Sequence, residues 1–188
     1  MRIIAGAQRG LRLATVGKGD EAAHLRPTSD RVRESLFNVL GSGRFGDPVT
    51  GAHVLDLFAG TGALGLEALS RGAVHVSFVE NGRKAQALIA ENIRLMRCAT
   101  AVSVRRGDAT KLGPNPRKPC ALVFLDPPYG KGLGARALAA AVAGNWLAPG
   151  AIVVWEEGTG QLPPEGFVLL DSRRYGDTYI TLMQWMPE

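Results

Sequence analysis

Strand-like and helix-like segments alternate along most of this chain, and that alternation limits the folds open to it. From residue 52 onward, short and almost uninterrupted apolar runs are separated by longer segments in which apolar residues recur at helical spacing. A strand that is apolar on both faces belongs to a parallel sheet covered by helices on both sides. The pattern therefore predicts an α/β fold with one sheet at its centre.

The ends of these elements are indicated by glycines, prolines and changes of periodicity. We expect helices over residues 63–71, 83–96 and 134–146. We expect strands over residues 53–59, 74–80, 101–105, 122–126 and 151–156. Gly176-Asp177 marks the turn of a terminal hairpin formed by residues 167–175 and 179–185. Together these elements make a seven-stranded, mostly parallel sheet with an antiparallel hairpin at its C-terminal end.

The first 50 residues differ from the rest, with eight Arg or Lys against five Asp or Glu and few long apolar runs. Residues 2–5 and 11–14 are expected to form a short hairpin. Thr28 or Ser29 is the expected N-cap of a helix. The buried face of that helix carries Val32, Leu36, Val39 and Leu40. We therefore divide the chain into a small N-terminal extension, residues 1–50, and a main domain, residues 51–188.

The loop after the first strand of the main domain reads Gly60-Thr61-Gly62-Ala63-Leu64-Gly65. A G-x-G-x-x-G loop between a strand and a helix is typical of nucleotide-cofactor binding, and an acid about 20 residues further on binds a ribose diol. Glu80 occupies that place. This pattern fits NAD(P) as well as S-adenosylmethionine, so an NAD(P)-dependent oxidoreductase is one alternative.

Asp56 favours S-adenosylmethionine over NAD(P). It lies four residues before Gly60, where a pyrophosphate would approach, and two anions in a partly desolvated site repel each other. S-adenosylmethionine presents a sulfonium and an ammonium there and has no phosphate. The alternative for Asp56 is a carboxylate that bonds only the amides of its own loop.

Four acids stand at or near the ends of successive expected strands, and in an open parallel sheet these ends share one edge, where ligands bind. Asp108 is the acid after the third strand, where it can accept from an adenine amine or act only as a turn residue. The residues expected to bind the cofactor at this edge are Asp56, Phe58, Ala59, Gly60, Thr61, Gly62, Glu80, Asn81, Asp108 and Ala109.

Asp126-Pro127-Pro128-Tyr129 ends the fourth of these strands, because two prolines cannot continue a ladder. The tetrapeptide presents a carboxylate, a rigid carbonyl and an aromatic ring together, which suits binding the exocyclic amine of a stacked heterocycle. We expect Asp126, Pro127 and Tyr129 to be the catalytic residues. A Pro-Pro turn beside an unrelated tyrosine is the alternative.

Composition bounds the partners. The net charge of +5 favours a polyanionic partner such as nucleic acid. The two cysteines and three histidines show no metal-ligand spacing, so we expect no metal. No apolar run approaches a membrane span, and Arg2, Arg9 and Arg12 leave no room for a signal peptide. We expect a soluble, cytoplasmic monomer.

These motifs together resemble the RsmD family of bacterial 16S ribosomal RNA guanine-N2 methyltransferases, named for guanine 966. The similarity runs from the first residue to residue 178, and the block of residues 26–37 is its most specific part. It is carried by residues 1–6, 26–37, 54–65, 78–80 and 126–129. The resemblance implies a Rossmann-like class I S-adenosylmethionine-dependent methyltransferase. Its substrate would be a guanine N2 amine in 16S rRNA or the small ribosomal subunit.

With this resemblance, the basic N-terminal extension is expected to bind RNA. Arg31 and Arg33 are placed on the exposed side of the helix, where they bind phosphates or help it to close as a lid over the cofactor. The alternative is that these arginines belong to a solvent-exposed polar helix face with no binding role. The full expected RNA-binding set is Arg9, Thr28, Ser29, Arg31, Arg33 and Arg174.

Two further functions share the main motifs. Asp-Pro-Pro-Tyr serves any exocyclic amine, so a DNA adenine-N6 or cytosine-N4 methyltransferase is an alternative, although the chain has no large target-recognition domain. A non-catalytic RNA-binding assembly factor is another. The intact loop, acids and tetrapeptide argue against it.

Overall fold

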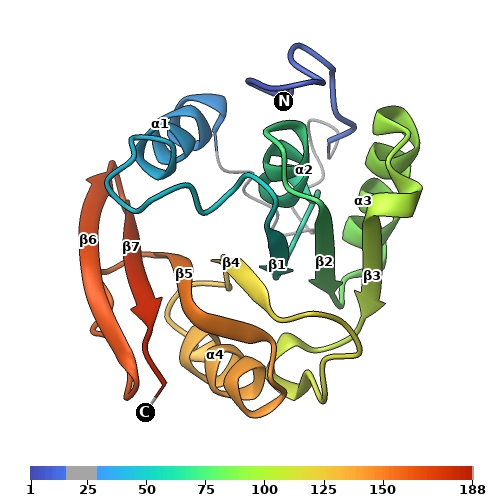
Figure 1. Cartoon of the computed structure of the whole chain (residues 1–188). Coiled ribbons are helices and arrows are strands. Elements are labelled where there is room, and N and C mark those ends of the chain that lie inside the picture. Colours follow the sequence, from blue (N-terminus) through green and yellow to red (C-terminus); the bar gives the residue numbers. More distant parts are fainter. Residues whose placement is uncertain (16–28, 188) are drawn as a thin grey trace.

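A central seven-stranded sheet organises the structure, which is a computed structural model that describes residues 1–15 and 29–187 (Figure 1). The strands are β1 (His53–Leu57), β2 (His75–Glu80), β3 (Val102–Arg106), β4 (Cys120–Leu125), β5 (Leu147–Glu157), β6 (Phe167–Tyr175) and β7 (Thr178–Trp185). The helices are α1 (Asp30–Leu40), α2 (Ala63–Ser70), α3 (Arg83–Met96) and α4 (Leu133–Ala143), with short 3₁₀ turns η2 (Ala99–Ala101) and η3 (Ala109–Lys111).

The strand order is β3-β2-β1-β4-β5-β7-β6. β1 to β5 pair in parallel, whereas β7 pairs antiparallel with both β5 and β6. The expected mostly parallel sheet with a C-terminal antiparallel hairpin is therefore confirmed. Two bounds differ in a way that matters for the site. β5 begins at Leu147 and continues to Glu157, and β4 ends at Leu125, one residue before Asp126.

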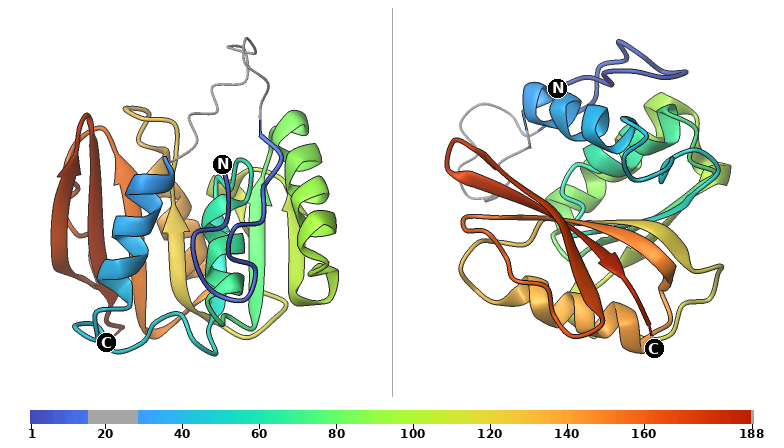
Figure 2. Two further views of the ribbon diagram at one scale, coloured as in Figure 1. Left: turned by 90° about the horizontal axis from the view of Figure 1, so that it is seen from above. Right: turned by 60° about the vertical axis from the view of Figure 1, so that its left-hand side comes forward.

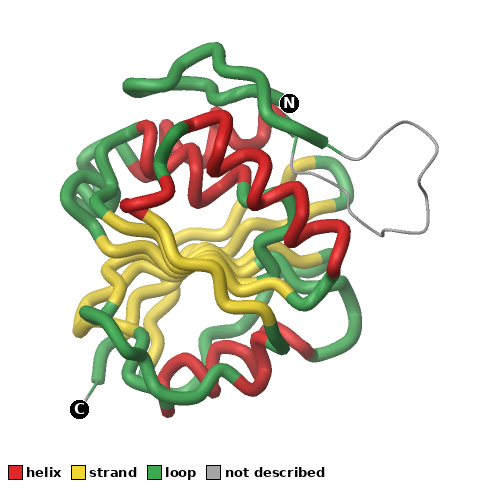
Figure 3. Tube along the Cα trace, turned by 90° about the vertical axis from the view of Figure 1, so that its right-hand side faces the viewer, coloured by secondary structure: helices red, strands yellow, loops and turns green. Residues whose placement is uncertain are grey.

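Helices cover both faces of the sheet. α1, α2 and α3 lie on one face and α4 on the other (Figure 1), and Figure 3 shows the sheet edge-on between these two layers. The strands are apolar on both sides, as the continuous runs required. Val54 of β1 belongs to the core cluster beneath α1 and α2, and its neighbour Leu55 belongs to the cluster beneath α4. None of the described helices has the length and apolar character needed to cross a membrane.

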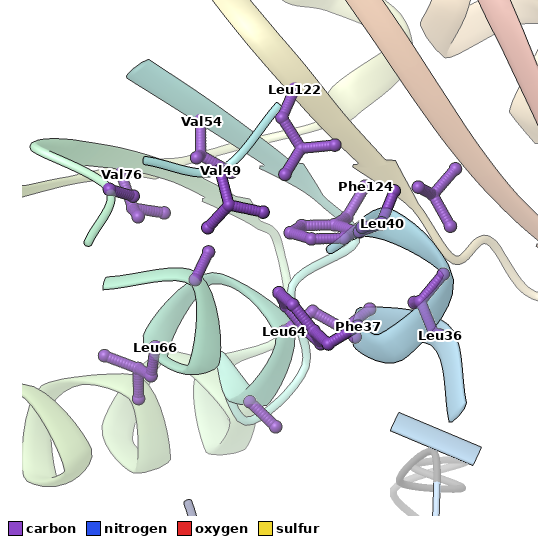
Figure 4. Close-up of a cluster of buried hydrophobic side chains, with 14 of the residues drawn as sticks. Leu36, Phe37, Leu40, Val49, Val54, Leu64, Leu66, Val76, Leu122 and Phe124 are labelled. Carbon is purple, nitrogen blue, oxygen red and sulfur yellow. The ribbon is translucent and has the colours of Figure 1, made fainter. Parts of the chain in front are cut away.

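The helix of the N-terminal extension is part of the main core. The Ser29 hydroxyl accepts from the Val32 amide at 3.3 Å, which confirms Ser29 as the N-cap of α1; Thr28 lies outside the described residues. Phe37 is buried against Phe124 of β4, with ring centroids 5.7 Å apart (Figure 4). Leu36 and Leu40 join the same cluster. The extension and the sheet thus share one hydrophobic core.

The expected N-terminal hairpin forms as a short bridged loop. Ile3 exchanges hydrogen bonds with Leu11 and Gly10, each at 2.9 Å, and a single bridge joins Arg2 to Arg12. The loop lies over α2 (Figure 2). The buried Glu67 carboxylate of α2 accepts from the amides of the hairpin residues Ile4 and Ala5 at 2.8 and 3.1 Å.

The position of Arg33 differs from the one expected from the sequence. We expected it on the exposed side of α1, but its side chain is fully buried. It lies 2.9 Å from Asp30 and 3.7 Å from Glu67, and it donates to the Arg2 carbonyl. The physical reason is helical spacing: position 33 falls three, four and seven residues before the buried Leu36, Phe37 and Leu40. Arg33 therefore joins α1 to α2 and the hairpin, and it is not available to RNA.

The shared core predicts that the hairpin and α1 unfold with the sheet. Phe37→Ala should lower the free energy of unfolding by about 3–5 kcal/mol, because it leaves a cavity against Phe124. The neighbouring exposed substitution Asn38→Ala should change it by no more than about 0.5 kcal/mol. Urea denaturation followed by circular dichroism measures both. A loss below about 1 kcal/mol in Phe37→Ala would contradict a shared core.

Candidate active site

Acidic side chains gather at one edge of the sheet, on the face covered by α1, α2 and α3. Each of four strands has an apolar residue in the core cluster of that face and, two residues later, an acid. Side chains alternate along a strand, so each acid points to the same face as its apolar neighbour. The carboxyl ends of parallel strands share one edge, so the four acids line one side of it. They are Asp56, Glu80, Asp126 and Glu156.

The glycine loop after β1 begins α2 directly. Gly60 and Gly62 have φ of 57° and 77°, in the left-handed region that glycine adopts without strain. Gly65, in the first turn of α2, packs against β2 so closely that a Cβ there would lie 2.5 Å from the Phe78 ring. These glycines let the loop turn tightly while α2 approaches the sheet. The backbone of residues 60–62 is thereby placed at the carboxyl edge.

Glu80 holds the loop from the end of β2. Its Oε2 accepts from the Gly60 amide at 2.9 Å, and its Oε1 accepts from the Gly82 amide at 2.7 Å. A carboxylate offers about four lone-pair sites, so each oxygen retains one acceptor site beyond these bonds. That arrangement fits the two hydroxyls of a ribose, as expected for the cofactor. Asn81 follows directly and is exposed.

Asp56 takes the local role that we had named as its alternative. It is only 2% exposed, and its Oδ2 accepts from the Gly65 amide at 3.0 Å. Burial raises the pKa of Asp56 from 3.8 to about 8; the Gly65 bond opposes this rise and the charge of Glu80 adds to it. Burial thus disfavours the charged form of this carboxyl. Its charge therefore does not exclude a pyrophosphate, and a contact from Asp56 to the cofactor stays a prediction.

Asp108 forms the turn after β3. Its Oδ1 accepts from both the amide and the hydroxyl of Thr110 at 2.8 Å, and these bonds lower the pKa of the exposed Asp108 carboxyl. The Gly107 amide donates to the Glu80 carbonyl at 3.1 Å, which ties this turn to β2. Asp108 is therefore a charged turn residue beside Glu80, and its bond to an adenine amine stays a prediction. Ala109 is the first residue of η3 and is buried in the core cluster beneath α4.

Asp126 lies directly after β4, where its amide donates to the Leu57 carbonyl at 3.4 Å. Burial raises the pKa of Asp126 well above its ordinary value, and the charges of Glu156, Asp56 and Glu157 raise it further. Pro127 is buried and Pro128 is exposed, so the chain turns outward at this point. The carboxyl thus sits in a desolvated position with other acids around it.

Tyr129 is fixed at its hydroxyl and open at its ring. The hydroxyl donates to Glu156 Oε1 at 3.0 Å and lies 3.1 Å from the Thr178 hydroxyl of β7. Tyr129 is 40% exposed, and its ring packs on Gly158, where a Cβ would come within 3.3 Å of it. Burial raises the pKa of the hydroxyl, so Tyr129 remains neutral. An anchored, partly exposed ring suits stacking against a base.

Two site residues were missed in the sequence. Glu157 Oε1 accepts from the amides of Gly130 and Gly158 at 3.1 and 3.0 Å, which holds the loop after Tyr129. Glu156 bonds Tyr129 itself. Both belong to the Trp155-Glu156-Glu157-Gly158 end of β5. The available signal was an acid at the end of a fifth apolar strand, the same signal that marked the other strands.

Asn92 of α3 was also missed, and it links the glycine loop to the N-terminal hairpin. Its buried side chain donates to the Thr61 carbonyl at 2.9 Å. It also accepts from the Ala14 amide at 2.7 Å and donates to the Ala14 carbonyl at 3.2 Å. A single asparagine on a helix gives no pattern in the sequence, so nothing there could have found it.

The residues expected to bind RNA lie on two neighbouring elements and on the hairpin. Arg31 on α1 and Arg174 on β6 are exposed, and a 2.9 Å contact between the hydroxyls of Ser35 and Tyr175 joins the two elements. Arg9 is exposed on the hairpin, and Ser29 is the cap of α1. A surface groove of about 470 Å³ runs beside α1, and its lining includes Arg31, Arg44 and Arg173. Within residues 1–15 and 29–187, no group of acids, cysteines and histidines could hold a metal.

The loop geometry predicts the effect of losing Glu80. Glu80→Ala should weaken S-adenosylmethionine binding about 10- to 100-fold, because it removes an acceptor for the ribose and frees the Gly60 and Gly82 amides. Isothermal titration calorimetry measures the affinity, with the partly exposed substitution Glu91→Gln as the control that binds normally. Unchanged affinity in Glu80→Ala would contradict this assignment.

Comparison with known proteins gives the family. The family model described as Conserved hypothetical protein 95 matches residues 1–184. Ribosomal RNA small subunit methyltransferase D of Haemophilus influenzae is 33% identical over 189 residues, covering 98% of this chain and 93% of that protein. The Escherichia coli protein of the same name is 36% identical over 156 residues, covering 83% and 74%.

The solved structures agree with this result. The Escherichia coli methyltransferase yhhF is 32% identical with a TM-score of 0.83, covering 100% of this chain and 99% of that one. A methylase from Haemophilus influenzae is 31% identical with a TM-score of 0.77, covering 99% and 98%. These matches span the chain, from the hairpin and α1 through the whole sheet. The methyl donor is S-adenosylmethionine. This chain therefore belongs to the RsmD family and is a methyltransferase.

Proposed function

We propose that this enzyme transfers a methyl group to the exocyclic N2 of a guanine in 16S rRNA, at a guanine 966-type site of the small ribosomal subunit. The observation that carries the proposal is the Asp126 carboxyl at the edge of the sheet, beside the anchored and open ring of Tyr129. Support also comes from the relatives named ribosomal RNA small subunit methyltransferase D.

Guanine N2 is a poor nucleophile because its lone pair is delocalised into the ring. When bound, S-adenosylmethionine supplies an electrophilic methyl group, so that the N–CH₃ bond forms as the S–CH₃ bond breaks with its electron pair on sulfur. The Asp126 carboxylate and the Pro127 carbonyl accept the two N2 hydrogens and direct the lone pair toward that methyl. Positioning and stabilisation of the positive charge on N2 supply most of the rate.

Asp126 also receives the proton that N2 loses. Its raised pKa makes the Asp126 carboxylate a stronger base than an exposed aspartate, so it can take this proton after methyl transfer. Asp126 must first be ionised, because a protonated carboxyl presents a donor to the amine. The raised pKa moves that ionisation to higher pH. The reaction rate therefore depends on pH through the ionisation of Asp126.

The RNA must bring its base out of the stack, and exposed basic side chains would hold the backbone while it does so. Arg9, Ser29, Arg31 and Arg174 are the described residues proposed for this contact; Arg33 is excluded by its burial. In this proposal residues 1–50 serve RNA binding together with Arg174, and residues 51–188 carry out methyl transfer, within one copy of the chain.

Product analysis tests the proposal. Small ribosomal subunits that lack the modification are incubated with the enzyme and S-adenosylmethionine labelled on its methyl group, and the RNA is digested to nucleosides. N2-methylguanosine is the expected labelled product. Label in N6-methyladenosine or N4-methylcytidine, or no label in RNA, would overturn the proposal and favour the DNA-type or non-catalytic alternatives.

Asp126→Ala should separate chemistry from binding. Single-turnover methyl transfer should fall by a factor of about 10² or more, whereas S-adenosylmethionine affinity stays within a few-fold. In the wild type the rate should rise with pH through the raised pKa of Asp126, because only the ionised form accepts the N2 hydrogens. Quench-flow assays across pH test this. Unchanged turnover in Asp126→Ala would reduce Asp126 to a turn residue.

Arg31→Ala should weaken RNA binding and leave cofactor binding unchanged. The salt dependence of RNA affinity should become shallower, by roughly 0.7–0.9 in log–log slope for each phosphate that the variant no longer binds. Filter binding over a range of salt measures the slope. Arg94→Ala is the matched control, since Arg94 is exposed on α3 and pairs with Glu91. Loss of S-adenosylmethionine affinity with an unchanged slope would instead make α1 a lid over the cofactor.

A further inference from the structure

A second carboxylate stands beside Asp126 on the neighbouring strand. Leu125 of β4 pairs in parallel register with Trp155 of β5, so the next residues along, Asp126 and Glu156, are adjacent across the sheet. Neighbouring strands are about 4.8 Å apart. The residues two positions earlier, Phe124 and Val154, belong to one core cluster, which places both acids on the same face. Asp126 and Glu156 therefore point into the same space.

Glu156 is held in that space by the loop that carries Tyr129. It is 9% exposed, and its Oε1 accepts from the Tyr129 hydroxyl at 3.0 Å. The charge of Glu156 is, after burial, the largest influence that raises the pKa of Asp126, so the two carboxyls are close enough to interact strongly. Glu156 thus adjoins both the residue proposed to bind the amine and the ring proposed to stack on the base.

The neighbour of Asp126 on the other side offers no comparable group. Leu57 of β1 pairs with Leu125, which places Phe58 next to Asp126 on that side. A phenylalanine side chain neither donates nor accepts a conventional hydrogen bond. The carboxyl of β1 on the same face, Asp56, pairs two positions earlier with Phe124 and accepts from the Gly65 amide at 3.0 Å. Of the two strands that flank β4, β5 therefore presents the polar side chain at the level of Asp126.

The bases differ at the position next to their exocyclic amine. In guanine, the N2 amine lies between N1–H, which is another donor, and N3, which is an acceptor. In adenine and cytosine, the ring nitrogen beside the amine carries a lone pair, which is an acceptor. Two adjacent carboxylates complement the neighbouring N1–H and N2–H donors of guanine. They repel the edges of adenine and cytosine, where a carboxylate would face a lone pair.

We propose that Glu156 is a specificity-determining residue, which accepts the guanine N1–H while Asp126 binds the N2 amine. This inference rests on the proposed function, and it names the residue that selects the base. The Asp-Pro-Pro-Tyr loop binds an exocyclic amine, and Glu156 reads the atom next to it. Glu156 excludes adenine and cytosine by placing a carboxylate against their ring-nitrogen lone pair.

The test uses a base that differs from guanine at the N1 position. 2-Aminopurine keeps the exocyclic 2-amine but carries a lone pair at N1 in place of N1–H. Two otherwise identical 16S rRNA fragments carry guanine or 2-aminopurine at the proposed target position, and single-turnover methylation of each is measured. The wild type should prefer guanine by about 10- to 100-fold, from the loss of one hydrogen bond to a charged group.

Glu156→Gln should lower the guanine rate and reduce that preference about tenfold or more, because the new amide can donate to the N1 lone pair of 2-aminopurine. Comparing variants cancels the different intrinsic reactivity of the two amines. Glutamine keeps the size of the side chain and an oxygen for the Tyr129 hydroxyl. Unchanged S-adenosylmethionine affinity in calorimetry establishes that the variant is folded.

A control separates base reading from loop positioning. Glu157→Gln alters the neighbouring carboxylate that holds Gly130 and Gly158. It should keep the wild-type ratio of guanine to 2-aminopurine, whatever its rate. If the wild type methylates guanine, then a wild-type ratio in Glu156→Gln, or a ratio that Glu157→Gln lowers just as much, would overturn the inference. Failure of the wild type to methylate guanine would overturn the proposed function itself.

Discussion

Side chains of a β-strand alternate between its two faces, and parallel neighbours keep that alternation in register. In this enzyme the rule acts on strands that end in an acid two positions after a core residue. Val54 and Phe124 are in the core, so Asp56 and Asp126 must emerge on the same face, at the same edge. The glycine loop, the Tyr129 loop and α1 all reach this edge. A slip of one residue in any strand would turn its acid toward α4.

Gathering acids on one buried edge costs stability, because desolvation and mutual repulsion both favour the protonated forms. The raised pKa values of Asp56 and Asp126 express this cost. Backbone amides offset part of it. Glu80 and Glu157 each accept from two amides, and these amides belong to the loops that surround the site. The charges that the chemistry requires therefore also fix the loops around them.

The sequence predicted most of the fold because its elements are long, periodic and clearly bounded. The bounds of α3 and the Ser29 cap agree with the structure, and the parallel pairing of β1 to β5 agrees with the prediction from their apolar runs. The candidate site was reached through acids at strand ends. Glu156 was overlooked although it also ends an apolar strand, because its relation to Asp126 exists only once β4 and β5 are paired.

Arg33 could not be placed correctly because its charge indicated an exposed side chain while its helical spacing indicated a buried one. An arginine is buried only where it finds partners, and these come from elsewhere in the chain. Those partners are Asp30, Glu67 and the Arg2 carbonyl. Only Asp30 is close in sequence. Long-range pairs of this kind leave no local periodicity, so a sequence pattern cannot reveal them.

The same long-range contacts join the basic hairpin to the glycine loop. Glu67 binds the hairpin amides from α2, the helix that the glycine loop begins. Asn92 bonds both Ala14 and Thr61, so one buried side chain spans the end of the hairpin and the middle of the loop. A displacement of the hairpin therefore strains the hydrogen bonds of Glu67, on the helix after the glycine loop, and of Asn92, which bonds the loop itself. Residues 1–15 therefore carry exposed basic side chains and also support the geometry of the glycine loop, because Asn92 bonds both segments.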